Sequence, residues 1–245
     1  FFALFSLIII GSLWEFYSLS NINNKNPQKW LGLFFGLLTY ATAFFHARGN
    51  LAATWFLVIF FGFFIFSIAE LFRKQVNPAS VFYSFMGVIY IAGTLSTANY
   101  LVFEQSEGHA FSYQFELILS IFIIIWINDT MAYLIGKKTG KHPLMKNVSP
   151  KKTWEGTLAG LAFACITSII LSAFLTPLNI KEAGILGIII SIAAILGDLF
   201  ESAIKRNSGR KDSGALLPGH GGILDRFDAA LFAIPFSFFY LNLFV

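Results

Sequence analysis

Charged residues are scarce in this chain of 245 residues: they make up 12%, against about a quarter in an ordinary soluble domain. That shortage excludes a water-soluble globular protein. Cysteine is almost absent as well, and the single Cys165 excludes an internal disulfide. The chain contains neither GxxxxGK(S/T) nor GxGxxG, so the common nucleotide-binding folds are excluded on motif grounds.

Hydrophobic residues make up 56% of the chain, and the mean hydropathy is +0.70. They occur in runs of about 17 to 24 residues, the length that a helix needs to cross ~30 Å of hydrocarbon. Segments of alternating polarity, which are typical of a transmembrane β-barrel, do not occur. We therefore predict an all-α polytopic integral membrane protein with about eight transmembrane helices, near residues 1–19, 31–45, 51–72, 79–101, 112–135, 157–176, 183–203 and 224–245.

The basic residues fall almost entirely on one side of the predicted helices. Fifteen of the 17 Lys and Arg residues lie in loops of that side, and only Arg48 and Lys181 lie on the other. The positive-inside rule assigns the rich side to the cytoplasm. We therefore expect a protein of the cytoplasmic membrane whose site faces the cytoplasm. Because the chain begins at Phe1 inside an apolar run, we also expect a further transmembrane helix upstream.

Residues 1–111 contain few polar groups, and we predict that they form a transmembrane scaffold. Glu15 and Glu70 lie near cytoplasmic helix ends, where carboxylates commonly pair or meet water, so both are expected to be structural. The GxxxG spacing of Gly32–Gly36 favours close helix packing. This part is assigned to scaffold, lipid contact or an oligomer interface, a homodimer included. Residues 112–245 are assigned to catalysis.

The first polar feature of the C-terminal part is the end of the fifth predicted helix, where Asn128 and Asp129 interrupt an apolar run. A buried acid in a membrane helix either pairs with a Lys or takes part in a functional site, and both interpretations of Asp129 remain open.

The loop 136–156 carries six Lys and one Glu. Such a loop can be an ordinary cytoplasmic loop or a contact with anionic lipid. Its internal order, Ser149-Pro-Lys-Lys-Thr-Trp-Glu-Gly156, favours anion binding instead. A helix that starts near Pro150 would present N–H groups and a positive dipole end to a phosphate. Lys151 and Lys152 add charge, and the hydroxyls of Ser149 and Thr153 add donors.

The stretch 197–228 carries the densest chemistry, between two apolar runs. One predicted helical face carries four polar residues at positions i, i+3, i+4 and i+7: Asp198, Glu201, Ser202 and Lys205. Asp225 and Asp228 are three apart at the start of the last apolar run. Since Mg²⁺ takes oxygen ligands from carboxylates and phosphates, we interpret the two helix ends as meeting around a divalent cation and a nucleotide phosphate chain.

A glycine-rich turn, Leu217-Pro-Gly-His-Gly-Gly222, precedes these two acids. Glycine lets a backbone approach a ligand closely, although most turns of this composition are ordinary loops. His220 in its centre can serve as a phosphate donor, a proton carrier or a turn residue.

The sequence resembles the phosphatidate cytidylyltransferase (CDP-diacylglycerol synthase) family over about residues 126–228. The resemblance is carried by Ser149–Gly156, by Gly197-Asp-Leu-Phe-Glu-Ser202, and by Ser202-x-x-Lys205-Arg206-x₄-Lys211-Asp212-x-Gly214-x₂-Leu217-Pro218-Gly219-His220-Gly221-Gly222-Ile223-x-Asp225-Arg226-Phe227-Asp228. It implies that CTP and phosphatidate give CDP-diacylglycerol and pyrophosphate, with Mg²⁺ and a K⁺ alongside. It implies no nucleic-acid partner.

The resemblance and the residue patterns together give the candidate site. The metal ligands that the resemblance implies are Asp198, Asp225 and Asp228. The candidate catalytic residues are Asp198, Lys205, Arg206, Lys211, Asp225, Arg226 and Asp228. The candidate substrate-binding residues are Asn128, Asp129, Ser149, Lys151, Lys152, Thr153, Glu155, Ser202, Asp212, His220, Gly221 and Gly222.

Two other functions stay open at this point. A CTP-dependent polyprenol or phytol kinase would transfer the γ-phosphate to an alcohol, a weaker nucleophile that needs a base such as Asp129 or His220. An ion-coupled transporter would place acids near the middle of the bilayer and in repeated halves, whereas these acids lie at the cytoplasmic edge and no internal repeat is present.

Overall fold

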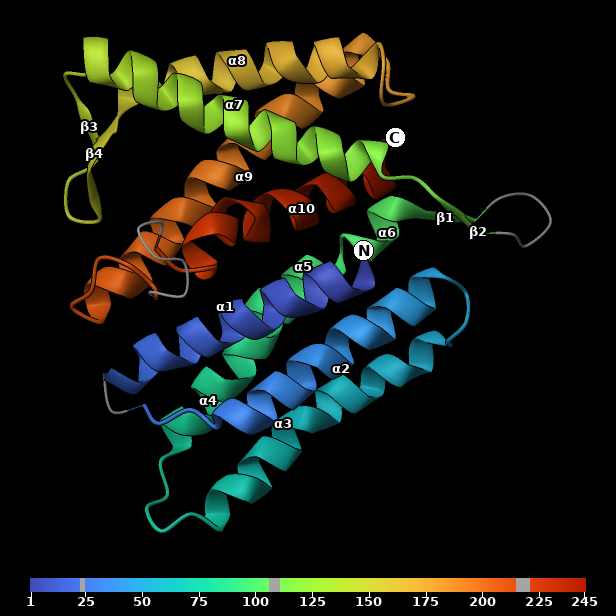
Figure 1. Ribbon diagram of the computed structural model, residues 1–245, viewed down its shortest axis with the longest axis vertical. Helices are drawn as coiled ribbons and strands as arrows, with labels where there is room; N and C mark the ends of the chain where they lie inside the picture. Colours follow the sequence, from blue (N-terminus) through green and yellow to red (C-terminus); the bar gives the residue numbers. More distant parts are fainter. Residues whose placement is uncertain (23–24, 106–110, 215–220) are drawn as a thin grey trace. The chain divides into compact units, whose positions relative to one another are not determined.

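The computed structural model describes residues 1–22, 25–105, 111–214 and 221–245. In this part of the chain the fold is all-α, apart from two short two-stranded sheets (Figure 1). It divides into two compact units. Unit 1 comprises Phe1–Ser112 and Ile204–Phe227, and unit 2 comprises Tyr113–Ala203 and Asp228–Val245. The division of labour predicted for residues 1–111 and 112–245 stays a prediction.

Eight helices in the described residues are long and apolar enough to cross a membrane, which confirms the predicted number. Their ends lie within four residues of the predicted ones. They are Phe2–Ser20, Lys29–Ala47, Ala53–Leu71, Pro78–Val102, Glu116–Thr139, Trp154–Ser172, Ile180–Asn207 and Leu224–Phe244. The chain is an integral membrane protein.

Unit 1 begins with three membrane-spanning helices. They are α1 (Phe2–Ile22), α2 (Lys29–Ala47) and α3 (Phe56–Leu71), the last preceded by the 3₁₀ turn η1 (Ala53–Trp55). The fourth span is not one α-helix but a series: α4 (Pro78–Gly87), the π-helical η2 (Val88–Gly93), α5 (Thr94–Ser96) and α6 (Asn99–Val102). The strands β1 (Phe103–Gln105) and β2 (Phe111–Tyr113) follow and pair with each other.

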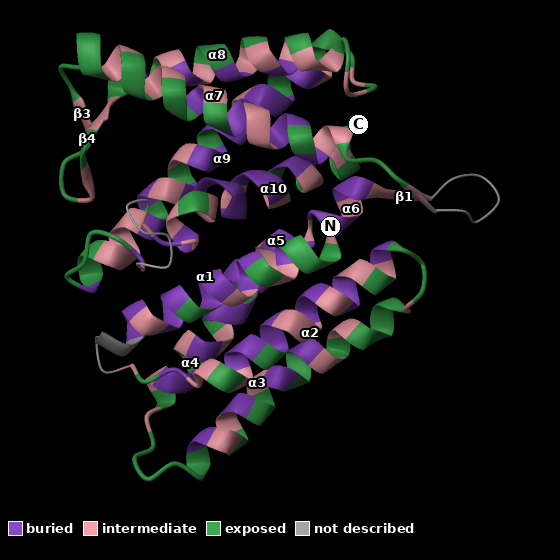
Figure 2. Cartoon of the chain, viewed as in Figure 1, coloured by how far each residue is buried: buried purple, intermediate pink, exposed green. Residues whose placement is uncertain are grey.

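The glycines of α2 provide the close packing that their spacing predicts. A side chain at Gly32 would collide with the ring of Tyr17 on α1, and one at Gly36 would collide with Leu13. The hydroxyl of Tyr17 donates to the carbonyl oxygen of Ser84 at 2.7 Å, so α1 is tied to α4 as well. As a result α1 is buried along most of its length (Figure 2).

The outer helix of unit 1, α3, exposes an apolar side (Figure 2). Its exposed side chains recur at helical spacing: Leu57, Phe60, Phe61, Phe64, Ile65 and Ile68. A membrane helix that faces lipid exposes such a row, because lipid chains are as apolar as the side chains themselves.

Unit 2 contains the remaining spans and a hairpin. Its elements are α7 (Glu116–Thr139), β3 (Pro143–Met145), β4 (Ser149–Thr153), α8 (Trp154–Ser172) and most of α9 (Ile180–Asn207) and α10 (Leu224–Phe244). α7 and α8 lie side by side along their length (Figure 1). Small residues allow this approach: a side chain at Gly156 would meet the carbonyl oxygen of Ala132, and one at Gly160 would meet Asn128.

Candidate functional site

The predicted helix start near Pro150 is wrong. Residues Ser149–Thr153 form strand β4, which pairs with β3, and α8 begins only at Trp154. Two local preferences explain the shift. The residue before a proline avoids the helical region, and a threonine caps a helix well because its hydroxyl accepts from the first turn. The Thr153 hydroxyl accepts from the Gly156 N–H at 3.3 Å.

The start of α8 is therefore less open to an anion than the sequence indicated. The N–H of Trp154 donates to the carbonyl oxygen of His142 at 2.9 Å, and that of Gly156 is used by the cap. Glu155, a predicted substrate-binding residue, accepts from the His142 ring at 2.6 Å. Among the described residues that line the pocket of unit 2, neither Ser149 nor Glu155 is found.

A pocket of about 530 Å³ opens in unit 2 between α7, α8, α9 and the hairpin. It brings together residues that lie far apart in the sequence. Its lining consists of Asn128, Asp129, Ala132, Tyr133, Gly136, Lys137, Lys151, Lys152, Thr153, Thr157, Ile195 and Asp198. Six of these are predicted site residues, so the Lys-rich loop and the first acid of the 197–228 stretch meet here as expected.

The carboxylate of Asp198 on α9 forms the central contact of this pocket. Its Oδ2 pairs with Nζ of Lys152 at 2.5 Å, and its Oδ1 accepts from the Ser202 hydroxyl at 3.2 Å. The second contact follows from the i, i+4 spacing on one helix. Both side chains of the ion pair are about one-third exposed or less, so the pair lies at the pocket wall and remains accessible.

Asn128 is one of the residues that line the pocket, and its side chain is fully buried. Its Oδ1 accepts from the Ser191 hydroxyl of α9 at 2.6 Å, and its Nδ2 donates to Asp129 at 3.1 Å. Asn128 therefore joins α7 to α9 and holds the neighbouring Asp129, and its predicted contact with a substrate stays a prediction. Ser191 was not predicted, because a serine inside an apolar helix gives no local sign of such a partner.

We expect the substitution Asn128→Leu to lower the free energy of unfolding by about 1–3 kcal/mol, because the buried Ser191 hydroxyl then has no acceptor in Asn128. The double variant Asn128→Leu/Ser191→Ala removes both polar groups and should recover part of that loss. Unfolding of the purified variants in detergent measures both effects. A double variant less stable than the single one would contradict the assignment.

The second group of predicted residues lies in unit 1, on the segment that joins α9 to α10. The carboxylate of Asp225, in the first turn of α10, pairs with Nζ of Lys205 at 2.6 Å. It also accepts from the backbone N–H groups of Ser213 at 3.0 Å and Gly222 at 2.7 Å. Gly221 has a φ of +80°, which favours glycine and turns the chain into this arrangement.

The other predicted residues of this segment are solvent-exposed. Arg206, Lys211, Asp212 and Arg226 all present their side chains to the surface of unit 1. This placement suits groups that meet a soluble polyanion. His220 lies outside the described residues.

The predicted metal ligands are divided between the units. Asp198 and Asp228 belong to unit 2, and Asp225 belongs to unit 1. In unit 2, α9 and α10 approach closely at these residues, since a side chain at Gly197 would collide with the backbone carbonyl of Asp228. Among the described residues no group of three His, Cys, Asp or Glu side chains is arranged to hold a metal ion. The metal set stays a prediction.

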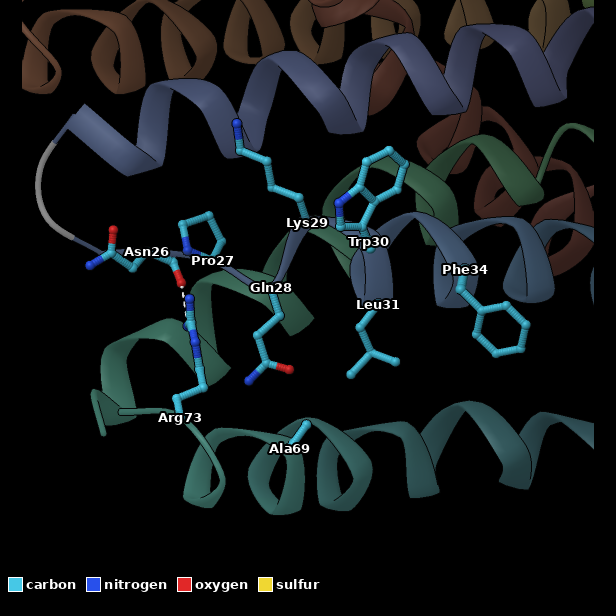
Figure 3. A pocket seen from close by; sticks show the side chains of 9 residues that line it. All are labelled: Asn26, Pro27, Gln28, Lys29, Trp30, Leu31, Phe34, Ala69 and Arg73. Carbon is cyan, nitrogen blue, oxygen red and sulfur yellow. Dashed lines mark hydrogen bonds between the residues drawn. The ribbon is translucent and has the colours of Figure 1, made fainter. Parts of the chain in front are cut away.

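Unit 1 has a second, shallower hollow of about 800 Å³ beside the start of α2 (Figure 3). Arg73 in its wall donates to the carbonyl oxygen of Asn26 at 2.8 Å and pairs with Glu70 at 3.1 Å. Glu70 also accepts from Gln28 and from the Asn77 N–H. These contacts join the loops at this end of the helices, in line with the structural role expected for Glu70.

A pocket that gathers lysines and carboxylates near the ends of membrane-spanning helices is typical of an enzyme that handles phosphate groups next to lipid. The model of the cytidylyltransferase family matches residues 1–244. The chain belongs to the cytidylyltransferase family, and it is a nucleotidyltransferase.

Three bacterial relatives illustrate the similarity, and each is named phosphatidate cytidylyltransferase. The chain is 37% identical to the one from Staphylococcus haemolyticus over 179 residues, which is 73% of this chain and 65% of that relative. It is 33% identical to the one from Staphylococcus aureus over 237 residues, which is 94% of this chain and 87% of the relative. For Staphylococcus epidermidis the identity is 31% over 236 residues, with the same coverage.

Proposed function

We propose that this protein is a phosphatidate cytidylyltransferase, which converts CTP and phosphatidate to CDP-diacylglycerol and pyrophosphate. The observation that carries the proposal is the pocket of unit 2, where Lys152 pairs with Asp198 beside Lys151, Lys137 and Asp129. Three ammonium groups and two carboxylates in one hollow suit a phosphate chain together with a cation. The similarity to the named relatives supports the choice of lipid substrate.

In the proposed reaction a phosphate oxygen of phosphatidate attacks the α-phosphorus of CTP in line with the leaving group. The new P–O bond forms as the bond between the α-phosphorus and the bridging oxygen breaks, and pyrophosphate leaves with that electron pair. A phosphomonoester is already largely ionised at neutral pH, so no dedicated general base is needed. Catalysis then consists of holding two anions together and offsetting the charge on pyrophosphate.

The lysines of the pocket are proposed to do most of this work. Lys151 is exposed at the pocket wall, and Lys152 is held there by Asp198, so both are placed to meet phosphate oxygens. The Thr153 hydroxyl accepts from the helix start and can still donate its own proton. Lys205, Arg206, Lys211 and Arg226 are proposed to serve the remaining phosphate charge.

The donor chemistry of Asp198, Asp225 and Asp228 fits Mg²⁺, which prefers carboxylate oxygens and substrate phosphates. When bound, Mg²⁺ would neutralise phosphate charge and polarise the reacting phosphoryl group, and a K⁺ would add to that neutralisation. Lys152 already holds Asp198. Asp198 would hold the cation, and the Lys152 ammonium group beside it would meet the phosphates.

We further propose that the site faces the cytoplasm in the cytoplasmic membrane. The distribution of Lys and Arg supports this orientation, since the residues of the pocket lie on the side that carries fifteen of the 17 basic residues. CTP, a water-soluble polyanion, would then reach phosphatidate at the boundary of the inner leaflet.

Labelled CTP tests the proposed reaction directly. The purified protein is incubated in micelles that contain phosphatidate and Mg²⁺, with CTP labelled at the α-phosphate. It should transfer the label into lipid and release pyrophosphate that carries no label. Transfer from the γ-phosphate alone would instead identify a lipid kinase. A reaction without phosphatidate is the control and should leave CTP intact. Failure to transfer either label to any lipid would contradict the proposal and favour the ion-coupled transporter instead.

A further inference from the structure

Glu15 is a buried carboxylate in the C-terminal half of an apolar helix, and the proposed reaction does not use it. It lies on α1, with 2% of its surface exposed. Burying an ionised carboxylate in a membrane protein is costly unless hydrogen-bond donors surround it. The identity of its donors therefore shows what it is for.

All the donors described for Glu15 come from the segment between α9 and α10, about 200 residues further along the chain. Its Oε2 accepts from the Ser213 hydroxyl and from the Leu224 N–H, both at 2.9 Å. Its Oε1 accepts from the Ile223 N–H at 3.1 Å. These residues all belong to unit 1, so the contacts lie within one compact body.

The segment is shaped to fit this carboxylate. A side chain at Gly214 or Gly222 would collide with the carboxyl group of Glu15. One turn earlier on α1, a side chain at Gly11 would collide with Ile223. Gly222, one of the glycines of the turn Leu217–Gly222, thus makes room for Glu15.

The contacts also explain how α10 begins. A helix leaves its first N–H groups without intrahelical partners, and Ser, Thr, Asp or Asn just before the helix usually accept from them. The residues before Leu224 are Gly222 and Ile223, which carry no such side chain. Glu15 supplies the missing acceptor from another helix, and its negative charge suits the positive end of α10.

The neighbouring contacts of the same segment hold the predicted catalytic pair. Asp225 is the second residue of α10, and its carboxylate accepts from Ser213 and Gly222 and pairs with Lys205. Ser213 thus donates its hydroxyl to Glu15 and its N–H to Asp225. Any shift of Ser213 or of the start of α10 moves both carboxylates.

We propose that Glu15 is a positioning residue of the active site: it caps α10 from α1 and thereby fixes the Lys205–Asp225 pair in its reactive arrangement. The proposal rests on the proposed cytidylyl transfer for its kinetic consequence. In this proposal a residue of the part predicted to be scaffold, residues 1–111, holds the catalytic residues in position.

The substitution Glu15→Gln tests the proposal, since it keeps the size of the side chain and replaces one acceptor oxygen by an NH₂ group. We expect kcat for cytidylyl transfer to fall about 10²-fold, because a displacement of about 1 Å in catalytic groups has that effect. The KM for CTP should change much less. Amide hydrogen exchange in peptides that cover residues 208–226 should become about tenfold faster, because one of the two oxygens that accept from these backbone N–H groups is lost.

Glu70→Gln is the matched control, because Glu70 is an equally buried carboxylate of unit 1 and contacts Gln28, Arg73 and Asn77 instead of the start of α10. It should lower the thermal stability without changing kcat per folded molecule or exchange in residues 208–226. If Glu15→Gln behaves in the same way, Glu15 is merely structural and the proposal is overturned. Should Glu15→Gln fail to fold, Ser213→Ala removes one of the three contacts and should lower kcat in the same direction, by a smaller factor.

The two measurements, cytidylyl transfer and amide hydrogen exchange, test the proposed function and the positioning role of Glu15 separately. A wild-type protein without cytidylyl transfer would overturn the proposed function, while faster exchange in Glu15→Gln would still support the capping of α10. Unchanged exchange in Glu15→Gln would overturn the positioning role even if the wild-type enzyme is fully active.

Discussion

The substitution Asp198→Asn is expected to lower kcat for cytidylyl transfer about 10²- to 10³-fold while the protein stays folded. The change keeps the shape of the side chain and removes its charge. Asp198 then no longer pairs with Lys152 in the pocket of unit 2, and it becomes a poor ligand for Mg²⁺. Steady-state rates at increasing Mg²⁺ measure both effects, and the concentration of Mg²⁺ for half-maximal rate should rise.

Ser202→Ala is the control for this prediction. It removes the hydroxyl that contacts the other oxygen of Asp198 at 3.2 Å but leaves the charge in place. Its effect on kcat should be far smaller than that of Asp198→Asn. Near-normal turnover of Asp198→Asn at saturating Mg²⁺ would remove Asp198 from the proposed metal set.

The substitutions Asp225→Asn and Asp228→Asn are each expected to abolish turnover, and Asp225→Asn is also expected to lower stability. The carboxylate of Asp225 pairs with Lys205 and accepts from two backbone N–H groups. Asp225→Asn should therefore lower the free energy of unfolding by about 1.5–3 kcal/mol, as expected for hydrogen bonds to a charged group. Asp228 accepts from the backbone N–H of Ala229 at 2.7 Å, and its replacement by Asn is expected to act on turnover.

Thermal unfolding in detergent and turnover at saturating Mg²⁺ separate the two effects. Fully folded, inactive Asp228→Asn would support a direct role in the reaction. Activity close to that of the wild type in either variant would show that the corresponding carboxylate holds no essential metal. If Asp225→Asn were as stable as the wild type, the hydrogen bonds to Ser213 and Gly222 would not contribute as the structure indicates.

Features that depend on the helical repeat and on side-chain size were predictable from the sequence. The eight spans follow from the length of the apolar runs, and their ends lie within four residues of the predicted ones. The hydrogen bond between Asp198 and Ser202 follows from their spacing of four on a helix. The close approach of α1 to Gly32 and Gly36 likewise follows from the small size of these residues. Each depends on the helical repeat and on side-chain size, which the sequence states directly.

The start of α8 shows how a local signal can be misread. Proline is common at the first position of a helix, but Pro150 lies in β4, and Thr153 caps the helix instead. The pairing of β4 with β3 decides between the two, and strand pairing depends on residues outside the motif. Propensity alone could not rank the proline against the threonine.

The sequence by itself determined that the chain is a helical membrane protein, which of its residues carry charge into the membrane boundary, and which family its motifs resemble. Only the tertiary structure decided which of these groups meet. It paired Lys152 with Asp198, joined Asn128 to Ser191, and placed Glu15 against Ser213 and Leu224. A buried polar group must find its partners wherever folding brings them, and for Glu15 they lie about 200 residues away, beyond the reach of any local pattern.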